Sequence, residues 1–240
     1  MNRILQATLF LRYPHIFRDR QDPSSLMQFG IGVGDGWYAV VEALCETLHS
    51  RAGTTGTSPA PAAQIKQKLG KLVWYHDSAD AFVQGAVELA EWYSLRVCER
   101  SGEPGRLTRQ GGYIGVLSAR EARLRGAQEE TRWAWWPVPV PPPFAELTPA
   151  TLLGRGPLPA DAAPDLPEGW TDLADALLCW LSANEPGISL SSLGQQGGRL
   201  AAVPASPLPD RAAGALAFAS EMSRRLPPDR YWPGHPRPGG

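Results

Sequence analysis

The feature that most constrains the fold is a run of prolines in the middle of the chain. After Trp136 the sequence reads Pro-Val-Pro-Val-Pro-Pro-Pro, and further prolines follow as far as Pro167. Proline has a fixed φ and no backbone N–H, so this segment excludes a helix or a central strand and favours extended polyproline structure. We therefore predict a first module over 1–132, a proline- and tryptophan-rich connection over 133–164, a second module over 165–230 and an extended tail over 231–240.

The first module is expected to combine helices with a strand. From Trp37 the apolar residues recur at helical spacing for about three turns, and Glu42 and Glu46 occupy another face of that helix. A strand is predicted over residues 71–76, and a second apolar stripe predicts a helix over residues 78–97. This mixture is typical of the α+β class.

The second module repeats the same order of elements. Its opening Gly169-Trp170 aligns without a gap with Gly36-Trp37, and Gly198-Arg199-Leu200 matches Gly70-Lys71-Leu72. The matched apolar positions of the first helix are Trp37 and Trp170, Val40 and Leu173, Leu44 and Leu177, and Leu48 and Leu181. A helix over 210–226 matches the helix over 78–97, so we interpret the modules as two diverged copies made by internal duplication.

Composition narrows the class of partner. The formal net charge of 240 residues is −1, which gives no overall field to attract nucleic acid or an anionic membrane. No apolar run approaches the ~20 residues that span a bilayer, so no membrane partner is expected. The three cysteines, Cys45, Cys98 and Cys179, are odd in number and lie beside apolar helical patterns, which favours reduced core thiols and a cytoplasmic location.

Residues 12 to 121 resemble a family of small uncharacterised proteins of tailed phages and prophage-bearing bacteria. The resemblance rests on Arg12-Tyr-Pro-His-Ile-Phe, Phe29-Gly, Gly34-Asp-Gly-Trp, Leu44-Cys45, Gln64-Ile-Lys-Gln-Lys-Leu-Gly-Lys-Leu, Ala90-Glu91 with Ser94, and Cys98-Glu-Arg-Ser-Gly-Glu-Pro-Gly. It covers a little under half of the chain. It implies a phage or mobile-element setting and supplies no activity.

Members of that family typically close with a small zinc ribbon, which this chain lacks the ligands to form. The resemblance places Cys98 and Ser101 at the first ligand pair, and Ser118 and Glu121 at the second. Structural zinc needs four ligands, usually thiolates or imidazoles, and only one thiol remains here. We expect no bound zinc and no other cofactor, although the turn around Gly102 is expected to persist as a zinc-free hairpin.

Three patterns are candidates for catalysis or nucleotide binding, and each has a structural alternative. The glycines from Gly30 to Gly36 lack the Lys-Ser/Thr of a phosphate loop and are expected to form a tight turn instead. The His76-Asp77 pair could support a hydrolase-like enzyme, but no companion nucleophile is evident, and Asp77 or Ser78 is placed to cap the next helix. Cys45 and His49 lie one helical turn apart, which suits a nucleophile and its base or half of a metal site, but the more frequent arrangement is a core thiol beside an exposed imidazole.

An arginine-rich segment over residues 96–132 raises the alternative of a nucleic-acid-binding accessory protein. Its eight arginines, at positions 96, 100, 106, 109, 120, 123, 125 and 132, face five glutamates. A basic surface with Tyr113 could follow a phosphate backbone. The small excess of charge favours a solvated face with salt bridges, so nucleic acid is the less favoured partner.

Aromatic residues carry the main functional prediction. The chain holds nine tryptophans, more than two small cores need, and tryptophan is enriched at binding hot spots. We predict a non-catalytic protein that binds a host or mobile-element protein, such as an inhibitor of a host defence system or an immunity-like protein. The predicted binding residues are Trp74, Tyr75, Trp133, Trp135 and Trp136; the alternative for the tryptophans is that they hold the proline-rich connection against the first module.

Overall fold

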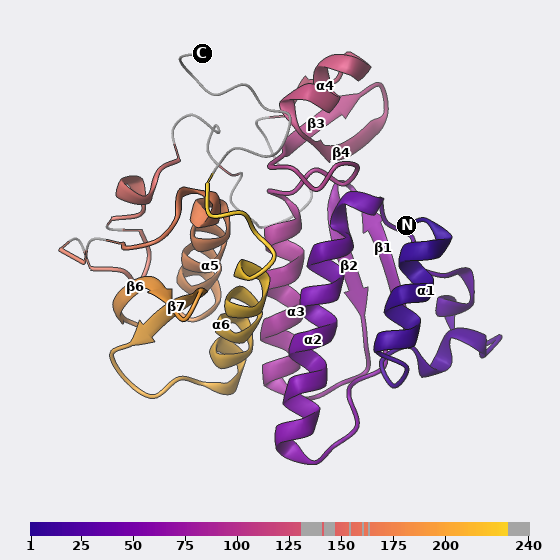
Figure 1. The fold of residues 1–240 in the computed structure, drawn as a ribbon, viewed down its shortest axis with the longest axis horizontal. Coiled ribbons are helices and arrows are strands. Elements are labelled where there is room, and N and C mark those ends of the chain that lie inside the picture. Colours follow the sequence, from indigo (N-terminus) through magenta and orange to yellow (C-terminus); the bar gives the residue numbers. More distant parts are fainter. Residues whose placement is uncertain (131–140, 142–146, 154, 160, 163, 230–240) are drawn as a thin grey trace.

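The computed structural model describes residues 1–130, 141, 147–153, 155–159, 161–162 and 164–229 (Figure 1). Helices occur together with antiparallel strands, which confirms the predicted α+β class. The extended tail predicted over 231–240 lies outside the described residues, as does the proline run over 137–143 apart from Pro141.

The first module begins with two helices that flank a set of short helical turns. Helix α1 spans Arg3–Arg12, and the 3-10 turn η3 (Asp35–Trp37) leads into α2 (Tyr38–Thr55). Asn2 begins α1 by accepting hydrogen bonds from the backbone N–H groups of Ile4 and Leu5. Helix α2 runs past the three turns predicted for it.

A two-stranded hairpin and a helix complete the module. Strand β1 (Gln64–Lys68) pairs antiparallel with β2 (Lys71–Tyr75), and α3 (Ala81–Ser94) packs on β2. The prediction that Asp77 or Ser78 caps this helix is wrong by a few residues, because the side chain of Asp80 accepts the hydrogen bond from Phe82.

A small lobe follows α3 and projects from one end of the molecule (Figure 1). It consists of β3 (Arg106–Gln110), β4 (Tyr113–Leu117), α4 (Ala119–Arg125) and β5 (Gln128–Glu129), with strand order β4-β3-β5. The turn expected around Gly102 directly precedes this lobe, where Cys98 N donates to Glu103 O at 2.7 Å and Gly102 N donates to Cys98 O at 2.9 Å.

The second module has the same order of elements as the first. The turn η6 (Glu168–Trp170) leads into α5 (Thr171–Asn184), then the hairpin β6 (Leu190–Gln196) and β7 (Arg199–Pro204), then α6 (Asp210–Ser223). Ahead of it, η5 (Pro149–Leu152) packs on α5 with Leu147 and Leu152 buried. Part of the predicted connection therefore belongs to the core.

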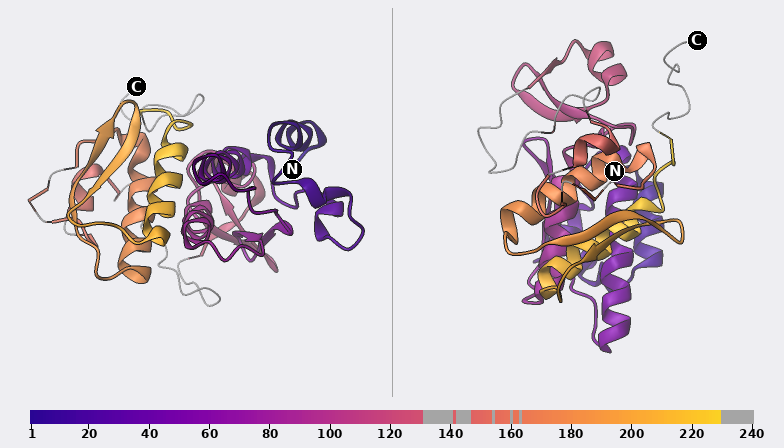
Figure 2. Two further views of the ribbon diagram at one scale, coloured as in Figure 1. Left: turned by 90° about the horizontal axis from the view of Figure 1, so that it is seen from below. Right: turned by 90° about the vertical axis from the view of Figure 1, so that its left-hand side faces the viewer.

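The modules meet where α3 crosses α6, in the centre of Figures 1 and 2. The helices touch backbone to backbone: a Cβ on Gly85 would lie 1.8 Å from the carbonyl oxygen of Arg211, and a Cβ on Gly214 would lie 1.9 Å from that of Phe82. The two contacts are reciprocal, and the apolar side chains of both modules form one continuous core.

Several backbone hydrogen bonds recur at matched positions in the two modules. Gly36 N donates to Glu99 O at 3.0 Å, and Gly169 N donates to Pro228 O at 3.2 Å. Leu72 N donates to Ser94 Oγ at 3.0 Å, and Leu200 N donates to Ser223 Oγ at 2.8 Å. These equivalent hydrogen bonds, each within its own module, show which residues of the two modules correspond. A common origin by duplication stays a prediction.

Candidate functional site

The aromatic surface predicted from the sequence is only partly within the described chain. Trp74 is 3% exposed and packs near the Phe17 ring, with 6.3 Å between ring centroids, so its indole is unavailable for an exposed contact. Tyr75 is 41% exposed, with Lys66 Nζ 5.1 Å from its ring centroid. Trp133, Trp135 and Trp136 lie outside the described residues.

The His76-Asp77 pair does not form an acid–base dyad. Nδ1 of His76 accepts a hydrogen bond from Ser78 N at 3.1 Å, which occupies that nitrogen with the backbone. Burial lowers the pKa of His76. The neutral imidazole therefore helps to shape the turn between β2 and α3.

Cys45 and His49 form the arrangement of a core thiol beside an exposed imidazole. Cys45 is fully buried, and this burial raises the pKa of its thiol well above the ordinary value, which disfavours the reactive thiolate. His49 is exposed and stacks edge to face on Tyr13, with 6.2 Å between ring centroids.

The glycine-rich loop is tight because it passes along the turn that follows α3. A Cβ on Gly34 would lie 1.9 Å from Glu99 O, and one on Gly36 would lie 2.2 Å from Cys98 O. These glycines therefore serve close backbone approach. Trp37 Nε1 also joins the glycine-rich loop to the turn after α3 by donating to Val97 O at 2.7 Å.

The residues that the resemblance places at zinc-ligand positions make local hydrogen bonds. Ser101 Oγ donates to a carboxylate oxygen of Glu103 at 3.0 Å, and Ser118 Oγ accepts from Glu121 N at the start of α4. Within the described part of the chain, no group of three or more His, Cys, Asp or Glu side chains could hold a metal ion.

Two members of the arginine-rich segment are structural. Arg96 is buried against Asp175 at 2.7 Å, and Arg106 is buried against Asp172 at 2.9 Å, so both guanidinium groups tie the first module to α5. Of the exposed members, Arg100 and Arg125 share Glu121, and Arg109 pairs with Glu130. Burial and pairing thus interrupt the arginine stripe that a nucleic-acid surface needs.

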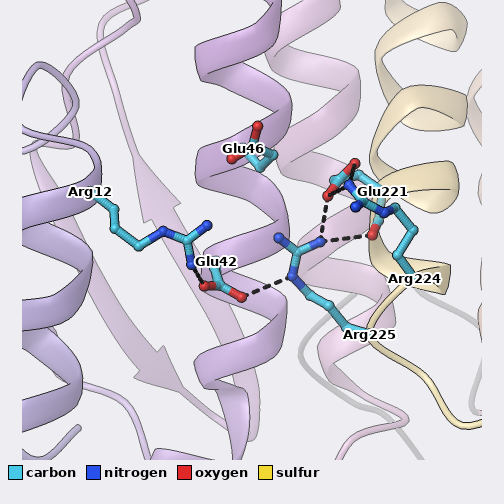
Figure 3. Close-up of a pocket in the computed structure, with 6 residues that line it drawn as sticks. All are labelled: Arg12, Glu42, Glu46, Glu221, Arg224 and Arg225. Carbon is cyan, nitrogen blue, oxygen red and sulfur yellow. Dashed lines mark hydrogen bonds and ion pairs between the residues drawn. The ribbon is translucent and has the colours of Figure 1, made fainter.

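A charged depression lies where α1, α2 and the end of α6 meet (Figure 3). Its volume is about 430 Å³, and all the described residues that line it carry charged side chains. The lining residues, called the charged depression below, are Arg12, Glu42, Glu46, Glu221, Arg224 and Arg225.

Ion pairs run across the depression from α1 to α6. Arg12 binds one carboxylate oxygen of Glu42, and Arg225 Nε binds the other at 3.0 Å. Arg225 Nη1 also contacts Glu221 at 2.6 Å, and Arg224 contacts the same carboxylate at 3.2 Å. This network joins segments that are far apart in the sequence.

Glu46 stands outside this network, one turn further along α2 (Figure 3). Tyr13 OH donates to Glu46 Oε2 at 2.8 Å, and burial together with this bond raises the pKa of Tyr13, which keeps the hydroxyl protonated. Among the described residues Glu46 makes no ion pair. The depression therefore holds one oriented carboxylate whose charge is not compensated by direct contact.

Helix α1, which supplies Arg12 to the depression, also carries an exposed apolar stripe. Ile4 and Leu11 are 79% and 82% exposed, and the exposed Ala7 lies between them on the same helical face. We call these three residues the α1 stripe. Leu11 directly precedes Arg12, which lines the depression, but consecutive residues of a helix point about 100° apart, so the stripe faces away from the buried side of α1.

Comparisons with known proteins found no match, whether to family models, to curated proteins or to solved structures. Within the described residues, no helix is both long and apolar enough to cross a membrane.

Proposed function

We propose that this chain is a non-catalytic protein-binding protein, and that the α1 stripe and the charged depression form its contact surface. The observation that carries the proposal is the solvent-facing stripe of Ile4, Ala7 and Leu11 on the same helix that supplies Arg12 to the charged depression. Protein interfaces combine an apolar centre with a polar rim, and arginine is enriched at their hot spots.

This proposal moves the contact surface away from the predicted aromatic residues. Trp74 is excluded by its burial, whereas Ile4 and Leu11 of the α1 stripe are large apolar side chains that are mostly exposed. Tyr75 and the three tryptophans near residue 135 remain predicted contributors.

The expected partner is a host or mobile-element protein, in keeping with the phage setting that the sequence resemblance implies. Inhibition of a host defence system and an immunity-like role are two forms of that function. The nucleic-acid alternative is less favoured because Arg96 and Arg106 are used inside the fold. The hydrolase alternative is less favoured because Nδ1 of His76 is occupied by the backbone.

The test is quantitative affinity capture from cells that express the protein. We compare wild type with an Ile4→Ser, Leu11→Ser double variant and with Leu124→Ser as a matched control. Leu124 is 71% exposed on α4, so its replacement removes a similar side chain from another surface. Thermal unfolding confirms that each variant is folded.

The proposal expects the double variant to lose a specific set of captured proteins that the Leu124→Ser variant retains. Truncating an interface anchor typically costs ~2 kcal/mol or more of binding free energy, which is enough to deplete a captured partner. An identical captured set for all three folded proteins would refute the proposed surface.

A further inference from the structure

An ion pair at the edge of the charged depression has an equivalent at the matched position of the other module, where the pair is buried. The register of the modules matches Arg225 with Arg96 and Glu42 with Asp175, and both arginines pair across the module boundary. Each arginine also donates from Nη1 to a carbonyl oxygen four residues earlier, at Glu221 and at Trp92. The fold therefore uses the same ion pair twice.

Both acids also bind an arginine from a segment that precedes their helix in the chain. Arg12 binds Glu42, and Arg155 binds Asp175. The Arg96–Asp175 pair is almost fully buried, whereas the Arg225–Glu42 pair is partly exposed and opens into the depression. The buried Arg96–Asp175 pair shows that an ion pair at this place in the fold can form without an open, charged depression around it.

The remaining positions differ in character between the two copies. Around the buried pair the matched residues are Trp92, Leu95 and Cys179, of which the first two are buried. Around the open pair they are Glu221, Arg224 and Glu46. Charged side chains therefore occupy three positions whose counterparts around the buried pair are apolar or weakly polar, and one of them, Glu221, also pairs with Arg199 of β7.

The three carboxylates of the depression also differ in their number of ion-pair partners. Glu221 and Glu42 each contact at least two arginines, while Glu46 is held only by the hydroxyl of Tyr13 among the described residues. The side chains of Arg12 and Arg224 are both 49% exposed at the edges. The depression is therefore lined by one carboxylate that makes no ion pair among the described residues and by two half-exposed guanidinium groups.

We infer that the depression receives a basic side chain, an arginine or lysine of the partner protein, which pairs with Glu46 while neighbouring acidic groups of the partner contact Arg12 and Arg224. This inference rests on the proposed protein-binding function and names the chemistry of its partner. A charge-assisted hydrogen bond to a fixed carboxylate is among the stronger polar contacts in an interface.

The experiment is an NMR titration of the full, ¹⁵N-labelled chain with blocked tripeptides. The probe is acetyl-Gly-Arg-Gly-amide, and its control carries citrulline, which has nearly the shape of arginine without the charge. The protein variants are Glu46→Gln, whose amide oxygen still accepts from Tyr13, and Glu129→Gln, which removes an exposed charge on β5.

We expect the arginine peptide to give saturable shifts around Glu46 and Tyr13, and the citrulline peptide to give none. Glu46→Gln should weaken peptide binding by roughly tenfold or more, while Glu129→Gln should leave it unchanged. Absence of saturable shifts up to about 10 mM peptide would overturn the inference. Tighter binding of free arginine than of the blocked peptide would also overturn it, in favour of a small zwitterionic ligand.

Failure of this inference can be separated from failure of the proposed function. If the Ile4→Ser, Leu11→Ser variant loses its captured partner while Glu46→Gln retains both capture and peptide binding, the function stands and the inference falls. If neither variant changes capture, the proposed function falls as well.

Discussion

Helices α3 and α6 approach each other so closely that one added methyl group should force the two modules apart. In Gly85→Ala the new Cβ would lie 1.8 Å from Arg211 O, and in Gly214→Ala it would lie 1.9 Å from Phe82 O. Both obstacles are backbone atoms of a helix, so rotation of a side chain cannot relieve the overlap.

The size of the effect follows from this geometry. The helices must separate by about 1 Å or more before the contact is tolerable, and neighbouring core side chains then lose part of their dispersion energy. Overpacking a core typically costs 1–3 kcal/mol, so we expect each variant to lose about 3 kcal/mol of unfolding free energy. The double variant should lose less than the sum, because the first separation makes room for the second methyl group.

The assay is guanidinium chloride unfolding, followed by tryptophan fluorescence and far-UV circular dichroism. Gly53→Ala is the matched control: Gly53 lies within α2, and a Cβ there would have no atom within 4 Å. Alanine has the higher helix propensity, so this control should be unchanged or stabilised by up to about 1 kcal/mol. Losses below about 0.5 kcal/mol for both Gly85→Ala and Gly214→Ala would refute the backbone contact.

Three further predictions concern buried polar groups. Arg96→Leu should cost about 3 kcal/mol of unfolding free energy, the lower end of the range for breaking a buried ion pair, because Asp175 loses Arg96 but keeps Arg155. Adding Asp175→Leu should recover much of that loss, and equal denaturation midpoints for the single and double variants would contradict this. Trp37→Phe should cost about 1–3 kcal/mol because Trp37 Nε1 donates to Val97 O, whereas Trp170→Phe should cost clearly less because Trp170 Nε1 has no partner among the described residues; equal losses in urea unfolding would refute the distinction. Burial raises the pKa of Glu99, so protonated Glu99 favours the folded state below the ordinary glutamate pKa, and this contribution is lost as the pH rises through the folded pKa. As the pH is raised from about 4, the unfolding free energy of Glu99→Gln should therefore fall less than that of wild type. Parallel plots of unfolding free energy against pH for the two proteins would contradict this.

The parts of the fold that could be predicted from the sequence depend on local patterns. The stripe of Trp37, Val40, Leu44 and Leu48 is buried in α2, and the matched stripe from Trp170 is buried in α5. Helical and strand periodicity is set by neighbouring residues, so such elements are visible in one sequence. Helix α1 was not predicted, because its exposed Ile4 and Leu11 blur the amphipathic pattern, although Asn2 offered a capping signal.

The candidate site could not be predicted in the same way, because it is assembled from distant segments. Glu42 and Glu46 were visible as polar residues on one helix face, but their surroundings come from Arg12 and from Arg225 at the other end of the chain. Nothing in the local pattern indicates that these groups meet. Trp74 shows the opposite problem: its residue type favours binding hot spots, while its position in β2 places it in the core.

Site-specific photo-crosslinking tests the central claim most directly. A photoreactive phenylalanine analogue is placed at Leu11 in one protein and at Leu124 in another, both at exposed helical positions, and each protein is irradiated in the cells that express it. The proposed surface predicts a discrete crosslinked protein from position 11 that is absent from position 124 and disappears when Ile4 is also replaced by serine. No crosslink from position 11, or the same products from both positions, would contradict the claim that α1 and the charged depression form the contact surface.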